Sequence, residues 1–147
     1  MNRSQLDALE AAARGWHGTP FCARSAVRGA GVSCHRLVAE LYREAGVLPP
    51  EVEIPDGSPL WSRAQDRSPM REWLDSGPGA RWFTPVTVAG VQPGDLLGFR
   101  IGRCVHHLAI ALRGDRIVHA TEGHGARVVD HIPDTWRRRL VVAWRPA

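Results

Sequence analysis

The stretch "GAGVSCHRLVAELYREAGVLP", residues 29–49, places a cysteine directly after a glycine-rich approach and at the start of a helical pattern. The apolar residues that follow recur with helical spacing and are Leu37, Val38, Leu41, Tyr42 and Ala45. Ser33 is the expected N-cap, and Gly46 with the prolines beyond it marks the end of the helix. The pattern therefore predicts a helix whose first turn carries Cys34.

A cysteine at this position lies beside backbone N–H groups that have no intrahelical acceptor, at the positive end of the helix dipole. Such an environment favours a nucleophilic thiolate. Gly29 and Gly31 would leave room for another chain to approach the backbone. A free cysteine is more often an apolar packing residue, so the position of Cys34 alone does not establish a nucleophile.

Composition narrows the class of protein. The chain has 147 residues, of which 44% are hydrophobic, the usual range for one globular domain with a sizeable core. No apolar run approaches the length of a membrane span, and the N-terminus lacks the apolar centre of a signal peptide. The net charge is +4, with arginine as the basic residue throughout. We find no aromatic–basic interleaving and no DNA-reading motif, so we expect no nucleic-acid partner; the excess charge favours an anionic polymer such as a cell wall.

The three cysteines, Cys22, Cys34 and Cys104, are odd in number and far apart, which argues against a disulfide framework. No C-x-x-C or H-x-x-x-H pair is present, so neither a structural zinc site nor any other metal or cofactor is expected. Cys22 and Cys104 are predicted to be packing thiols.

The chain divides into a helical first half and a strand-rich second half. A helix is expected from Gln5 to Arg14, capped by Ser4. Residues 50–85 form a proline-rich connector with a short helix at Ser68–Asp75, and its tryptophans are expected in the core or in a wall of the substrate site: Trp61, Trp73 and Trp82. Strands are expected at 86–88, 96–99, 104–112, 117–120, 126–132 and 140–144. This organisation predicts one α+β domain over residues 1–147.

Five segments, in order and with matching gaps, resemble the NlpC-type cysteine peptidases, a papain-like family that cleaves peptidoglycan stem peptides. They are "GWHGTPF" (15–21), the cysteine-led segment 29–46, "QPGDLLGF" (92–99), "HLAIALRGDRIVHA" (107–120) and "TWRRRLVVAWRP" (135–146). The branch that they most resemble is that of the phage cell-wall peptidases. The resemblance implies a papain-like fold in which N-terminal helices, one with the nucleophile at its start, pack on a central antiparallel sheet of about five or six strands.

The same resemblance implies the site residues. Cys34 would be the nucleophile, His107 the base, and His119 the group that orients His107. The residues implied to contact the substrate are Phe21, Gly31, Ser33 and His35. The chain departs from the family pattern at several of these positions, because the family usually has Asp before the nucleophile, Ser-Gly after it, and Tyr at the position of Phe21.

Two adjacent histidines compete for the role of base. Side chains alternate along a strand, so only one of His106 and His107 can face Cys34. A two-residue turn at Gly114–Asp115 would put His119 on the face of His106, whereas a three-residue loop with a bulge would put it on the face of His107. The resemblance selects His107, and an irregular or bulged hairpin is a required consequence.

The resemblance thus implies a cysteine peptidase or amidase that hydrolyses peptidoglycan stem peptides or muropeptides through a Cys-His-His triad and a thioacyl intermediate. Two alternatives stay open: a non-catalytic cell-wall or peptide-binding module on the same fold, and an acyltransferase with the same Cys/His pair. Because the substrate lies outside the cytoplasm and no signal peptide or membrane anchor is found, we expect synthesis in the cytoplasm, followed by delivery to the wall or association with a phage tail.

Overall fold

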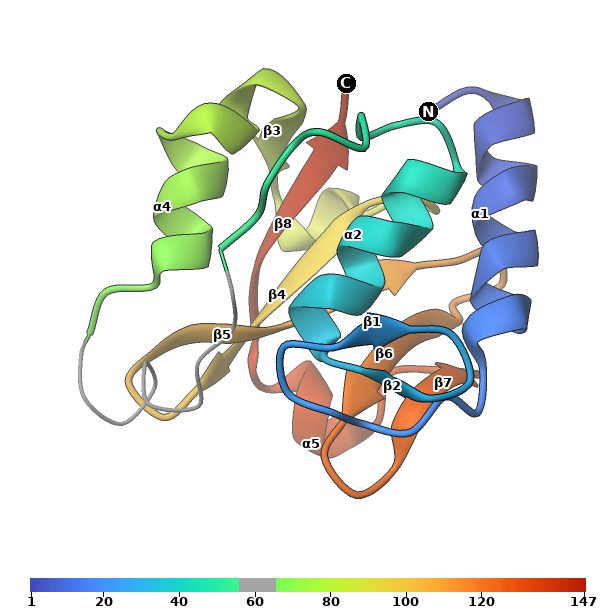
Figure 1. Cartoon of the computed structure of the whole chain (residues 1–147). Helices are drawn as coiled ribbons and strands as arrows, with labels where there is room; N and C mark the ends of the chain where they lie inside the picture. The colour runs from blue at the N-terminus through green and yellow to red at the C-terminus, as the bar shows by residue number, and fades with distance from the viewer. Residues whose placement is uncertain (56–65) are drawn as a thin grey trace.

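The computed structural model describes residues 1–55 and 66–147. Its helical elements are α1 (Arg3–Trp16), α2 (Cys34–Glu44), α4 (Pro69–Asp75), α5 (Asp134–Arg137) and the 3-10 turns η1 (Pro78–Arg81) and η2 (Val88–Gly90). A small hairpin is formed by β1 (Ala26–Val27) and β2 (Gly31–Val32). The main sheet consists of β3 (Phe83–Val86), β4 (Leu96–Ile101), β5 (Cys104–Ala111), β6 (Ile117–Thr121), β7 (Gly125–Val129) and β8 (Leu140–Pro146). The predicted α+β fold, with a central antiparallel sheet and N-terminal helices, is confirmed (Figure 1).

The sheet is antiparallel throughout and has the strand order β3-β8-β4-β5-β6-β7. Its two faces bury different sets of side chains, because successive residues of a strand point to opposite sides. One face packs on α1 and α2 through residues such as Leu9, Leu37, Leu108 and Ile110. The opposite face carries a smaller apolar cluster, which α5 covers in part through Trp136. The sheet therefore has one face covered by α1 and α2 and an opposite face covered in part by α5.

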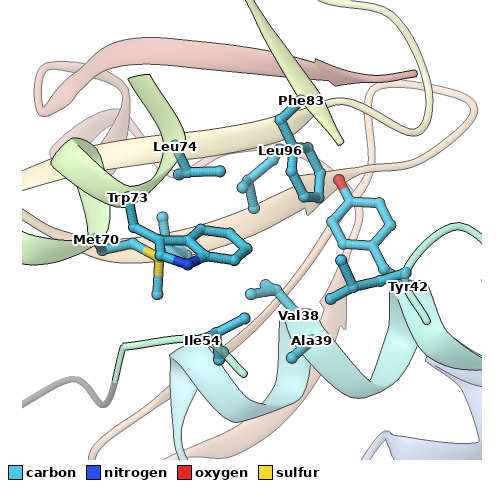
Figure 2. A pocket seen from close by; sticks show the side chains of 11 residues that line it. Val38, Ala39, Tyr42, Ile54, Met70, Trp73, Leu74, Phe83 and Leu96 are labelled. Carbon is cyan, nitrogen blue, oxygen red and sulfur yellow. The ribbon is translucent and has the colours of Figure 1, made fainter. Parts of the chain in front are cut away.

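Helix α2 is held firmly against the sheet. Figure 2 shows its Val38 and Tyr42 opposite Trp73 of α4, around an apolar pocket of about 20 Å³. Near the far end of α2, the buried Tyr42 hydroxyl donates a hydrogen bond to the Gly94 carbonyl at 2.9 Å. Cys34 is not among the residues that line this small pocket.

Two register shifts lie on either side of Phe99 in β4. Towards β5, Phe99 pairs with His107 while the next residue, Arg100, pairs with Val105, so His106 is an extra residue in β5. Towards β8, a second shift falls between Gly98 and Phe99. Bulges of this kind bend a strand and re-aim its side chains. The bulge in β5 falls directly on the histidine pair.

The segment between α1 and β1 runs along the outer side of β7. Ala126 exchanges two backbone hydrogen bonds with it, since Gly18 donates to Ala126 and Ala126 donates to Thr19, both at 2.8 Å. The Val128 N–H donates to Nδ1 of His17 at 3.0 Å. Gly125 is required here, because its φ is +73° and a Cβ would lie 2.3 Å from the Thr19 carbonyl oxygen.

Several predicted boundaries were wrong. Helix α1 is capped by Asn2, not Ser4, because Asn2 and Gln5 form a reciprocal capping box. The strand expected at 86–88 lies at Phe83–Val86, and Val88–Gly90 forms a 3-10 turn. The strand expected at 126–132 ends at Val129.

The connector partly matches its prediction. Its short helix is confirmed, with Ser68 as the N-cap of α4. Trp73 and Trp82 are half-buried and pack against the core, whereas Trp61 lies outside the described residues. Among the helices that the structure describes, none combines the length and apolar composition needed to cross a membrane.

Candidate active site

Cys34 is the first residue of α2, as the capping pattern predicts. The Ser33 hydroxyl accepts a hydrogen bond from the Arg36 N–H at 3.4 Å, which caps the helix. The Ser33 N–H donates to the Ser25 carbonyl at 3.1 Å and ties the helix start to the β1–β2 hairpin. The Cys34 side chain is largely buried, with 9% exposed.

Cys34, His107 and His119 meet at the start of α2. The Cys34 thiol lies beside the His107 side chain and interacts with its imidazole. Nε2 of His107 lies 2.9 Å from Nδ1 of His119, and both rings are buried. The β5–β6 register pairs Ala109 with His119, which puts His119 on the face of Ala109 and His107. The irregular hairpin that the choice of His107 required is therefore present.

The environment of the two imidazoles fixes their protonation. Burial, with a smaller contribution from His124, lowers the pKa of His119 to about 4, so His119 is neutral near pH 7. Burial also lowers the pKa of His107, and the hydrogen bond to Cys34 opposes that shift. We assign Nε2–H of His107 as the donor to Nδ1 of His119, which leaves Nδ1 of His107 as the acceptor for the thiol.

Two aromatic side chains enclose the His107 ring and were not anticipated as site residues. Trp136 of α5 stacks on it with centroids 4.5 Å apart and an interplanar angle of 35°, and Phe99 lies on it at 5.5 Å. Trp136 also meets the His119 ring edge-on at 6.0 Å. Phe99 lies directly opposite His107 in the β4–β5 register. Pairing the two predicted strands in this register would have indicated that Phe99 is next to the site. Trp136 belongs to "TWRRRLVVAWRP", and no local pattern in that segment indicates that its ring covers His107.

The residues expected to contact substrate have local structural roles. Ser33 is 5% exposed and caps α2. Gly31 is small because Cys22 fills the adjacent space, with its Cβ 2.7 Å from where a Cβ on Gly31 would stand. Phe21 is half-buried and forms a backbone bridge with Val32.

His35 is fully buried and faces protein carbonyl groups. Its Nε2 donates to the His106 carbonyl, and its Nδ1 lies 3.4 Å from the Pro55 carbonyl oxygen. The buried His35 ring is therefore not available for contact with a substrate.

The remaining cysteines differ from one another. Cys104 is buried, as predicted for a packing thiol, and burial raises its pKa, with a smaller effect from Asp66. The same prediction was wrong for Cys22, which is exposed. Within residues 1–55 and 66–147, no cluster of three or more His, Cys, Asp or Glu side chains is arranged to hold a metal ion.

Solved structures with this architecture support the fold. The NLP/P60-family lipoprotein-like protein from Staphylococcus aureus subsp. aureus Mu50 is 21% identical, with a TM-score of 0.63, and covers 99% of this chain. This chain spans 42% of the length of that protein. The NlpC/p60 domain of the peptidoglycan hydrolase SagA is 22% identical over 93% of this chain and 95% of its own, with a TM-score of 0.55.

A third neighbour has the same fold without catalysis. RipD of Mycobacterium tuberculosis, described as a non-catalytic NlpC/p60 domain protein, is 14% identical, covers 98% of both chains and has a TM-score of 0.58. No curated protein matches the sequence. The family model of NlpC/P60 matches residues 18–145, which include Cys34, His107, His119 and Trp136. By this match the chain belongs to the NlpC/P60 family.

Proposed function

We propose that this protein is a cysteine peptidase that hydrolyses peptide bonds in the stem peptides of peptidoglycan. The observation that carries the proposal is the arrangement of the Cys34 thiol beside His107, whose Nε2 lies 2.9 Å from Nδ1 of His119. A nucleophile, a base in contact with it and a third group that orients the base are the parts that amide hydrolysis needs. SagA, a neighbour in fold, is a peptidoglycan hydrolase, which supports the choice of substrate class.

In the proposed reaction, the Cys34 thiol gives its proton to Nδ1 of His107 and the sulfur attacks the scissile carbonyl carbon. The backbone N–H of Cys34, at the start of α2, is a candidate donor to the resulting oxyanion. When the C–N bond breaks, the His107 imidazolium protonates the leaving amine. Water then attacks the thioester carbon and gives a proton to His107. The C–S bond breaks, the acid leaves, and His107 returns the proton to Cys34.

His119 supports this cycle through the other ring nitrogen of His107. As a neutral acceptor, it holds the Nε2–H of His107 and stabilises the imidazolium that forms. Trp136 and Phe99 keep water away from this hydrogen bond, which strengthens it electrostatically. Delivery of the protein by a phage tail stays a prediction from the sequence resemblance.

A second candidate is a non-catalytic module that binds cell-wall peptides. RipD, a neighbour of similar fold, is described as adapted to peptidoglycan binding, and the residues that flank Cys34 here depart from the usual family pattern. The two candidates differ in whether the bound peptide is cut.

The test is incubation of the protein with purified muropeptides, followed by mass spectrometry of the fragments. We expect cleavage products that gain one water and that disappear in Cys34→Ala, while Cys22→Ala, which removes the exposed thiol, cleaves like wild type. Binding without fragments would favour the non-catalytic candidate. Transfer of the acyl group to an added amine in place of water would favour an acyltransferase.

A further inference from the structure

The start of α2 contacts β5 and β6 close to where the two strands stop pairing. Their last paired residues are Ala109 and His119, although β5 extends back to Cys104. A buried backbone carbonyl that receives no hydrogen bond from a neighbouring strand needs a donor from outside the sheet ladder. His35 supplies a donor to the carbonyl of His106, which is the extra residue of the β5 bulge.

This hydrogen bond links the covalent neighbours of the two reacting side chains. His35 follows Cys34 in the chain, and His106 precedes His107. The His35 ring is fully buried and meets the His106 ring edge-on, with centroids 5.5 Å apart. The thiol–imidazole contact and the His35–His106 hydrogen bond thus close one small ring of interactions between α2 and β5.

We infer that His35 is a positioning residue, which sets the distance and orientation of the Cys34 sulfur relative to the His107 imidazole through its Nε2–H···O=C bond to His106. Its kinetic consequence rests on the proposed peptidase function. A displacement of about 1 Å between reacting groups lowers turnover by up to about a hundredfold. Substrate binding should change little, because the buried His35 ring offers no surface to a substrate.

Three substitutions separate the hydrogen bond from simple packing. His35→Gln places an amide N–H near the position of Nε2 and keeps the donor. His35→Leu has similar bulk and no donor. His35→Asn has a donor that reaches only to the position of Nδ1. Tyr42→Phe is the matched control, because it removes another buried side-chain hydrogen bond from the same helix, far from Cys34.

Two readouts are measured for each variant: kcat and KM on a muropeptide, and the rate at which iodoacetamide alkylates Cys34, with the exposed Cys22 of the same sample as internal reference. We expect His35→Leu and His35→Asn to lower kcat about tenfold or more, with KM within about twofold. The ratio of Cys34 to Cys22 alkylation should fall in parallel. His35→Gln should stay within about threefold of wild type in both readouts, and Tyr42→Phe should lower thermal stability alone.

The outcomes also separate this inference from the proposed function. If the wild-type protein cleaves no muropeptide, the peptidase proposal fails, and the alkylation ratio still measures whether His35 positions the thiol. If His35→Leu keeps the kcat and the Cys34-to-Cys22 alkylation ratio of the wild-type protein, the inference is overturned. Equal losses in His35→Gln and His35→Leu would overturn it too, because they would assign the effect to ring packing. Should His35→Leu fail to fold, the comparison of His35→Gln with His35→Asn decides the question.

Discussion

His107 and His119 lie on one face of the antiparallel pair β5–β6, with Nε2 of the first 2.9 Å from Nδ1 of the second. This contact depends on the register that sets Ala109 opposite His119. A shift of one residue would send the two imidazoles to opposite faces. The irregular hairpin is therefore part of the site.

The first prediction separates the two adjacent histidines. His107→Ala removes the partner of the Cys34 thiol and should lower turnover by a factor of about a thousand or more, with the fold intact. His106→Ala keeps the backbone carbonyl that accepts from His35 and should retain turnover within about threefold. Muropeptide cleavage and circular dichroism measure the two effects, and a reversed order of activities would contradict the assignment.

The second prediction concerns the orienting role of His119. His119→Asn and His119→Gln retain an amide that can accept from Nε2–H of His107, so they should keep part of the activity. His119→Ala removes the acceptor and leaves a buried donor unpaired, so its kcat should be lower than that of either amide variant by about tenfold. Equal activity in all three variants and wild type would reassign His119 to the core.

The third prediction is a pH dependence of stability. Because the pKa of His119 is about 4 in the native protein and about 6.5 in an unfolded chain, the unfolded state binds more protons between these values. The free energy of unfolding should therefore decrease as the pH falls from about 6.5 to about 4, by about 3 kcal/mol from this residue, and burial of His107 acts in the same direction.

Urea denaturation at pH 7 and pH 4.5 measures this loss. In His119→Gln the difference between the two pH values should shrink by about 2 kcal/mol, whereas His131→Gln, at an exposed position, should leave it unchanged. If His119→Gln loses as much free energy of unfolding between pH 7 and pH 4.5 as the wild-type protein does, groups other than His119 cause that loss.

The fourth prediction ranks the three thiols. Cys34 is largely buried but lies at a helix N-terminus in contact with an imidazole, so its alkylation near neutral pH should be faster than that of the exposed Cys22. Cys104 should be slowest, because burial raises its pKa and restricts access. Peptide mapping after partial labelling measures the order. Faster labelling of Cys22 in the folded protein would argue against an activated Cys34.

The fifth prediction concerns the ring that covers His107. Trp136→Ala exposes the hydrogen bond between the two imidazoles to water and should lower kcat about tenfold, whereas Trp136→Phe retains a stacking partner and should lower it less. Trp82→Ala, which removes a half-buried ring next to the edge strand β3, is the control and should affect stability alone. A loss of activity in Trp82→Ala as large as in Trp136→Ala would indicate general destabilisation.

The elements that the sequence predicted well are those with long, regular patterns. Helix α2 has a capping serine, an apolar stripe and a terminal glycine, and these signals agree with one another. The strands β5 and β6 were also predicted close to the bounds that the structure gives them. These elements carry Cys34, His107 and His119, whose roles only the family resemblance implied.

The parts that were missed depend on tertiary contacts. Helix α5 has four residues, too few for an apolar period, and it is fixed by the packing of Trp136 on His107. The extra residue in β5 depends on pairing with β4, which no local pattern encodes. Likewise, the role of His35 follows from a bond to a residue 71 positions away.

The strip of chain at residues 17–19 has a consequence for the behaviour of the protein at high concentration. β7 would otherwise present open backbone donors at Ala126 and Val128, a template on which a strand from a second molecule can assemble. Both donors are already engaged, by Thr19 and by the His17 ring. On the opposite edge, β3 contains Pro85, which has no N–H to offer. On the β7 edge, two outward donors are thus unavailable to a second molecule, and on the β3 edge Pro85 removes one donor.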